Sequence, residues 1–148
     1  ADAVSGGRFR AMVEGRMAPP PVADIVGVEL TTMERGRATF HLDARPEHAS
    51  PLGTMQGGIL CVLADAAMGA AYVSLLEDDE SFATLELKVN FTRPITAETG
   101  RILCEGAIVH RGTRVATAEG RVFAERDERL LAHGTTTCLL FPLNGQPV

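Results

Sequence analysis

Hydrophobic and polar positions divide the chain into one long apolar segment with alternating runs on either side. The run at 25–42 alternates around a turn that ends at Gly36, which predicts a β-hairpin. Residues 43–56 contain two prolines and a glycine, which favours irregular structure. The segment 57–76 is apolar apart from Asp65, a pattern typical of a helix that a sheet surrounds.

Four more strand-like runs follow the apolar segment, at residues 82–91, 101–110, 114–125 and 129–140. The first of them alternates cleanly, which places Leu85, Leu87 and Val89 on one face. Short turns between the runs predict an antiparallel meander. Together with the hairpin and the helix, these runs predict an α+β fold with a single antiparallel sheet of about six strands.

The first 21 residues are expected to be a lead-in to this fold. Residues 5–17 carry apolar side chains on one face and predict a short helix that Ser5 caps. The prolines at 19–21 end this helix and begin an extended stretch. Because no repeat or second composition is visible, we expect residues 1–148 to form one domain.

Composition and charge exclude several classes of protein. Hydrophobic residues make up 45% and charged residues 22%, as in a globular chain. A net charge of −5 and only 5% aromatic residues argue against nucleic acid or an anionic membrane as a partner. The first residues include no apolar signal segment, and the three cysteines lie far apart in apolar runs. We therefore expect a cytoplasmic protein without disulfides, metal site or cofactor.

The length of the apolar segment suggests a membrane span, but its composition argues against one. Asp65 would cost about 3 kcal/mol at the centre of a bilayer, and no basic residues flank the segment. Its many alanines and glycines instead favour a helix whose backbone packs closely against a sheet.

Asp65 is the first candidate for a catalytic group. A carboxylate within an apolar helix is unfavourable unless it is paired or used chemically. Its neighbours one turn away cannot pair with it: Cys61, Val62, Met68 and Gly69. The alternative without chemistry is that a loop amide or a partner chain satisfies the carboxylate.

Gly57 and Gly58 begin the same helix, where the first backbone N–H groups have no partner within the helix. Such N–H groups can hold a developing oxyanion, although a glycine pair also permits a tight turn without any chemistry. Gly57 and Asp65 are eight residues apart, which is roughly 12 Å along a helix, so one helix cannot bring both to one carbonyl. If they cooperate, they come from different protomers, which predicts a two-fold dimer with shared sites.

Other catalytic motifs are absent from the sequence. There is no G-x-S-x-G elbow and no glycine-rich phosphate loop. The four histidines are dispersed, at positions 41, 48, 110 and 133, and histidines in such places usually belong to strands or loops.

A resemblance to a known family centres on residues 46–71, PEHASPLGTMQGGILCVLADAAMGAA. The segment resembles the signature of hotdog-fold thioesterases of the phenylacetate-degradation and 4-hydroxybenzoyl-CoA type. The matching positions are Gly53, Gly57, Gly58, Leu63, Asp65 and Ala67. The run at 84–94 resembles the third strand of the family, and the resemblance covers about residues 19–142.

The resemblance implies a helix wrapped by an antiparallel sheet and a homo-oligomer, either a dimer or a dimer of dimers. It implies hydrolysis of a small or medium acyl- or aryl-CoA, with Asp65 as nucleophile or general base and the Gly57 N–H polarising the thioester carbonyl. Thr84 matches a position whose hydroxyl often assists the carboxylate or a water. The positions that match contacts to the CoA phosphates are Arg93, Arg111 and Arg114.

Two candidate catalytic positions depart from the family pattern. Gln56 replaces the usual histidine, and Ser50 stands where asparagine or glutamine is usual. Gln56 can still donate a hydrogen bond, whereas Ser50 has a shorter reach. These changes leave open a non-catalytic protein that binds acyl-CoA or another small ligand. A dehydratase or hydratase is a further alternative, but it would need a catalytic histidine where this chain has Gln56.

Overall fold

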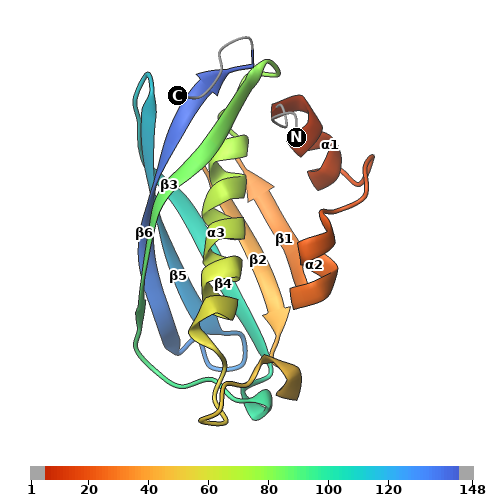
Figure 1. Ribbon diagram of the computed structural model, residues 1–148, viewed down its shortest axis with the longest axis vertical. Coiled ribbons are helices and arrows are strands. Elements are labelled where there is room, and N and C mark those ends of the chain that lie inside the picture. The colour runs from red at the N-terminus through yellow and green to blue at the C-terminus, as the bar shows by residue number, and fades with distance from the viewer. Residues whose placement is uncertain (1–5, 144–148) are drawn as a thin grey trace.

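The computed structural model describes residues 6–143 and has one antiparallel sheet curved around one long helix (Figure 1). The helices of this part are α1 (Gly6–Val13), α2 (Pro21–Val26) and α3 (Gly57–Val73). The strands are β1 (Val28–Glu34), β2 (Arg37–Asp43), β3 (Glu80–Phe91), β4 (Arg101–Arg111), β5 (Val115–Ala124) and β6 (Leu130–Pro142). The predicted α+β class and the wrapped helix are confirmed.

The short helix α2 is a difference from the sequence-based prediction. We expected an extended stretch after the prolines at 19–21, but Pro21 begins α2 instead. Proline suits this position because the first helical residue needs no N–H partner. Gly27 ends the helix in the left-handed conformation with φ 89°. The first strand therefore begins at Val28 rather than at Ile25.

The strand order β1-β2-β4-β5-β6-β3 also corrects the predicted meander. Strands β4, β5 and β6 follow one another as expected, but β3 pairs with β6 at the far edge of the sheet. The connection at 92–100 must then pass under the N-terminal end of α3, at the bottom of Figure 1. There it meets the loop before α3 through a hydrogen bond from the Met55 N–H to the Ile95 carbonyl at 2.7 Å. Two loops thus surround the start of α3.

Small residues let the backbone of α3 approach the sheet closely. A Cβ atom added to Gly106 on β4 would lie 2.6 Å from the backbone carbonyl atoms of Ala67. On β5, a Cβ at Gly120 would lie 3.3 Å from the Met68 sulfur. Because Ala67 and Met68 are fully buried, neither the sheet nor the helix has room for a larger residue at these points.

The N-terminal helix α1 packs against the C-terminal half of α3. It is shorter than predicted, and Ser5, its expected cap, lies outside the described residues. Phe9 packs on Phe82 with ring centroids 5.4 Å apart, and Phe82 packs on Tyr72 at 5.7 Å. These three rings join α1 to β3 and α3.

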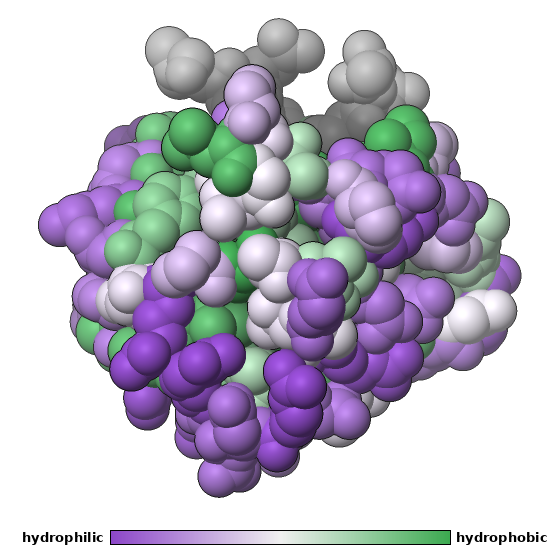
Figure 2. Space-filling view, turned by 90° about the horizontal axis from the view of Figure 1, so that it is seen from below, coloured by the Kyte–Doolittle hydropathy of each residue, from purple (hydrophilic) through white to green (hydrophobic). Residues whose placement is uncertain are grey.

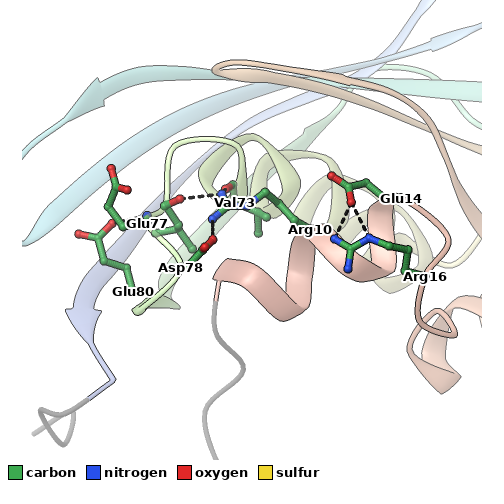
Figure 3. A network of polar contacts seen from close by, with 8 residues as sticks. Arg10, Glu14, Arg16, Val73, Glu77, Asp78 and Glu80 are labelled. Atoms are coloured by element: carbon green, nitrogen blue, oxygen red, sulfur yellow. Dashed lines mark hydrogen bonds and ion pairs between the residues drawn. The ribbon is translucent and has the colours of Figure 1, made fainter.

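Arg10 of α1 satisfies the C-terminal end of α3 (Figure 3). Its guanidinium donates to the Leu76 carbonyl at 2.7 Å and to the Val73 carbonyl at 3.5 Å, and it forms an ion pair with Asp78. A cation at a helix C-terminus compensates carbonyl groups that have no partner within the helix. No helix between residues 6 and 143 has both the length and the hydropathy to cross a membrane.

Substitution of Gly106 tests the close approach of α3 to the sheet. We expect Gly106→Ala to destabilise the protein by about 1–3 kcal/mol, because overpacking forces the α3 backbone away from β4. The free energy of unfolding is measured by urea denaturation. The matched control is Gly7→Ala, whose new Cβ would meet only the Asp78 side chain at 3.6 Å or more. Equal unfolding midpoints for the two variants would contradict the packing argument.

Candidate functional site

A cavity of about 610 Å³ lies at the N-terminal end of α3. Its lining includes four residues proposed from the sequence, Ser50, Gln56, Gly57 and Arg93. Figure 2 views the molecule from this end and shows hydrophobic surface between hydrophilic side chains. The apolar part of the lining includes Met55, Leu60, Phe91 and Ile95. Sequence reasoning missed these four, although Phe91 ends the alternating run that precedes Arg93.

Backbone hydrogen bonds hold the loop before α3 in place. The Gln56 N–H donates to the His48 carbonyl at 2.8 Å, and the Ser50 N–H donates to the Thr54 carbonyl at 2.7 Å. The Ser50 hydroxyl accepts the Leu52 N–H at 3.2 Å, so this side chain shapes the loop. Gln56, by contrast, is exposed at the start of α3 and makes no side-chain cap.

His48 has a structural role in this loop. Its ring is buried, Nδ1 accepts the Arg45 N–H at 3.2 Å, and Nε2 lies 2.8 Å from the Val26 carbonyl. The Arg45 N–H fixes the tautomer, because Nε2 must then carry the proton that it donates to Val26. With both nitrogens engaged and the ring buried, His48 has no free position for proton transfer to a ligand.

The start of α3 offers donors to the cavity. Within the described residues, no hydrogen bond involves the N–H groups of Gly57 and Gly58. A Cβ at position 57 would lie 2.9 Å from the Phe91 ring, so the ring covers the Gly57 Cα and leaves no room for a side chain. The first N–H groups of a helix attract negative charge. The arrangement therefore suits an oxygen that gains charge during a reaction.

Asp65 lies in the middle of α3, half-buried, on the side that faces β3. The Thr84 hydroxyl of β3 donates to the Asp65 carboxylate at 3.1 Å. The structure thus brings these two predicted site residues together. A hydrogen bond to a carboxylate orients it and stabilises its charged form, which suits a base or a nucleophile.

A β-bulge in β3 explains why Thr84 reaches Asp65. The pairing of β3 with β6 shifts between Thr84 and Glu86, so Leu85 is an extra residue. Thr84 before the bulge pairs with buried Cys138, and Leu87 after it pairs with buried Thr136. Both therefore face the helix. The predicted single face for Leu85, Leu87 and Val89 is wrong at Leu85, which is 58% exposed.

The remaining predicted arginines lie far from the cavity of their own chain. Arg111 forms an ion pair with Glu80 at 2.9 Å, and Glu80 also accepts the Glu77 N–H at 2.9 Å. Arg114 is exposed in the turn between β4 and β5, at the top of Figure 1, opposite the start of α3. Within one subunit, only Arg93 of the three lines the cavity.

The cysteines of the described chain are not suited to nucleophilic chemistry. Burial raises the pKa of the Cys61 thiol, and the nearby Asp65 charge raises it further. Burial raises the pKa of Cys104 to about 12 and that of Cys138 to about 11. All three thiols stay protonated at neutral pH, and only a thiolate is an effective nucleophile. Among residues 6–143, no group of three or more His, Cys, Asp or Glu could hold a metal ion.

Comparison with known proteins identifies a family. A sequence model of the thioesterase superfamily matches residues 52–131. The chain is 24% identical over 107 residues to 1,4-dihydroxy-2-naphthoyl-CoA hydrolase of Listeria monocytogenes serotype 1/2a, a match that covers 72% of this chain and 85% of that one.

Solved structures share the fold. A thioesterase family protein from Silicibacter pomeroyi is 28% identical with a TM-score of 0.80, over 90% of this chain and 98% of that chain. A phenylacetic acid degradation protein from Thermus thermophilus is 26% identical with a TM-score of 0.73, over 81% of this chain and 98% of that chain. The hotdog fold expected from the sequence resemblance is confirmed.

Cys61 offers a probe of the Asp65 charge. Asp65→Asn should lower the pKa of the Cys61 thiol, because it removes a charge that raises it. The pKa should stay above that of a free cysteine, because burial is the larger cause. The midpoint of the iodoacetamide alkylation rate against pH, followed at Cys61 by peptide mass spectrometry, measures this shift. Glu119→Gln, on the outer face of β5, is the matched control, and an equal shift there would contradict a local effect.

Proposed function

The chain belongs to the thioesterase superfamily and is a thioester hydrolase, and we propose that it hydrolyses acyl-CoA thioesters in sites shared between two subunits. The observation that carries this proposal is the Asp65–Thr84 hydrogen bond at 3.1 Å. It orients the one carboxylate of an otherwise uncharged helix at the edge of the sheet. The start of α3, with its open N–H groups, supplies the second half of the site.

Asp65 acts on the thioester in one of two ways. As a nucleophile, its carboxylate oxygen attacks the carbonyl carbon, the carbon–sulfur bond breaks, CoA leaves as the thiolate, and water then hydrolyses the resulting anhydride. As a general base, Asp65 takes a proton from a water that attacks the same carbon. In either case the carbonyl oxygen gains negative charge, which the Gly57 N–H stabilises. The Gln56 amide can donate to the same oxygen.

The two halves of the site are too far apart within one chain. Asp65 is bonded to Thr84, whereas Gly57 lies under the Phe91 ring. Seven residues of β3 separate Thr84 from Phe91, which is about 23 Å in an extended strand at ~3.3 Å per residue. A second subunit that runs antiparallel along β3 brings each half to its complement, so we propose a dimer or a dimer of dimers.

The cavity supports a small or medium acyl or aryl group. Its volume of about 610 Å³ lies within the range of roughly 300–1,000 Å³ common for ligand pockets. Leu60 and Phe91 offer apolar surface to the acyl group, and exposed Arg93 offers a guanidinium to a CoA phosphate. Arg111 and Arg114 can contribute from the partner, because an antiparallel arrangement brings its opposite end to this cavity.

Two alternatives make different predictions in the same assay. A dehydratase or hydratase needs a histidine at the site, but no histidine lines the cavity and His48 is fully engaged elsewhere. A binding protein without activity is compatible with the Ser50 and Gln56 replacements. A panel of acyl- and enoyl-CoA compounds separates the three, since only hydrolysis releases a thiol.

Substitution of Asp65 tests the chemistry. Asp65→Ala should lower kcat/KM for acyl-CoA hydrolysis by at least about 10²-fold, a typical contribution of a positioned acid or base. The helix should remain, because alanine is a strong helix former. Cys61→Ser, one turn earlier on the same helix, should keep nearly full activity. Near-wild-type turnover by Asp65→Ala would assign the chemistry to another residue.

Mixing of two inactive variants tests whether the site is shared. Gly57→Pro removes the donor N–H, and proline is tolerated at the first helical position. Each variant homodimer, Asp65→Ala or Gly57→Pro, should be nearly inactive, whereas a mixed dimer has one intact site. Random exchange at equal concentration should restore about a quarter of wild-type activity, because half of the dimers are mixed and each has one working site.

The matched control for this experiment is Gly57→Ala. It places the same Cβ against the Phe91 ring as proline does, but it keeps the N–H donor. It should therefore retain more activity than Gly57→Pro if the donor matters. Subunit exchange is verified by tagging one variant, and verified exchange without regained activity would rule out the shared site.

A further inference from the structure

Strand β3 forms an edge of the sheet with hydrophobic side chains exposed. It has twelve residues and pairs only with β6 within the described chain. Leu85 is 58% exposed and Phe91 is 54% exposed. A long unpaired edge with exposed apolar residues is a template for pairing with another strand. On the proposed function, that strand is β3 of a second copy, because the shared site needs it.

The middle of β3 limits how two copies can pair. Leu87 and Val89 pack against the core, while Glu86 and Lys88 are exposed on the outer face. Directly opposed residues of an antiparallel pair point to the same side. Leu87 must therefore lie opposite another inward residue of the partner strand.

Three registers satisfy this condition and keep Thr84 within one residue pair of the partner's Phe91. They place Leu87 opposite the partner's Leu87, the partner's Val89 or the partner's Phe91. In the same order, Glu86 then lies opposite the partner's Lys88, the partner's Asn90 or the partner's Thr92.

Charge distinguishes the three registers. With Leu87 opposite its own copy, two Glu86–Lys88 pairs form across the two-fold axis. With Leu87 opposite the partner's Val89, the two Lys88 side chains lie directly opposite each other, which is unfavourable. The third register forms no charge pair. Lys88 is the only lysine of the sequence, so no other ammonium group within a strand can take its place.

We propose that β3 pairs with β3 of a second copy with Leu87 on the two-fold axis and Glu86 opposite the partner's Lys88. The bulge at Leu85 then places Thr84 opposite the partner's Val89, because the count shifts by one residue. The partner's Phe91 and Gly57 lie one residue pair further, about 7 Å along the strand. That distance accommodates a carbonyl group between two partners at hydrogen-bond distance, with Asp65 on one side and the partner's Gly57 on the other.

Zero-length cross-linking of the wild-type protein tests this register. A carbodiimide joins a carboxylate to an amine directly, and Lys88 is the only lysine that can react. In a mixture of isotopically light and heavy protein, we expect an amide between Glu86 of one chain and Lys88 of the other. Mass spectrometry distinguishes this link from one within a chain, because only the former joins light and heavy peptides.

Charge reversal tests the same pairs by equilibrium. Glu86→Lys alone and Lys88→Glu alone each turn two attractive pairs into two repulsive ones, so each dimer Kd should rise on the order of 10-fold. Mixing the two variants should restore wild-type affinity as a heterodimer, in which both pairs are attractive. The matched control is Glu119→Lys, an exposed position on the same face of the sheet but on β5. Its Kd should change less than twofold.

Several outcomes overturn the register. These are a stable monomer at micromolar concentration, a dimer whose cross-links lack the Glu86–Lys88 amide between chains, or equal effects of the Glu86 and Glu119 variants. Thioester hydrolysis by the wild-type protein is measured separately. Activity without this cross-link leaves the proposed function and removes the register, and the cross-link without activity does the reverse.

Discussion

The contact between the α3 backbone and Gly106 of β4 determines where every functional group of this protein lies. A Cβ on Gly106 would come within 2.6 Å of the Ala67 carbonyl group, so helix and sheet touch without intervening side chains. Such contact leaves the helix little freedom to slide or rotate, because packed interiors accommodate even a methyl group poorly. With the rotation of α3 fixed by Ala67, Asp65 must point toward the edge strand β3, where Thr84 meets it.

The two ends of α3 have different environments. At the C-terminal end, Arg10 compensates the carbonyl groups and ties down the helix. At the N-terminal end, Gly57 leaves its N–H toward a cavity walled by loops that cross from both sides of the helix. A helix anchored at one end and open at the other is a natural anion site. Asp65 sits between them, which is why a second subunit is the simplest way to combine an acid group with an oxyanion donor.

Much of this arrangement could be predicted from the sequence. The lone charge of Asp65 within an apolar run indicated both the central helix and its reactive position, and Gly36 indicated the first hairpin. The position of β3 could not be predicted in the same way, because alternation gives the faces of a strand but not its neighbours. Pro21 misled for a similar reason, since proline both breaks helices and begins them. The contact of Arg111 with Glu80 joins strands whose neighbourhood only the fold defines.

The bulge at Leu85 divides β3 into two halves of opposite phase. Before it, the even-numbered residues Phe82 and Thr84 face the helix, and after it the odd-numbered residues Leu87 and Val89 do so. Loss of this single residue would turn the first half of the strand over and point Thr84 away from Asp65. Chain length at this position is therefore as constrained as residue type, although the strand lies at an edge where insertions and deletions usually accumulate. Among descendants of this sequence, a gap at Leu85 would mark the loss of the site even where Asp65 itself remains.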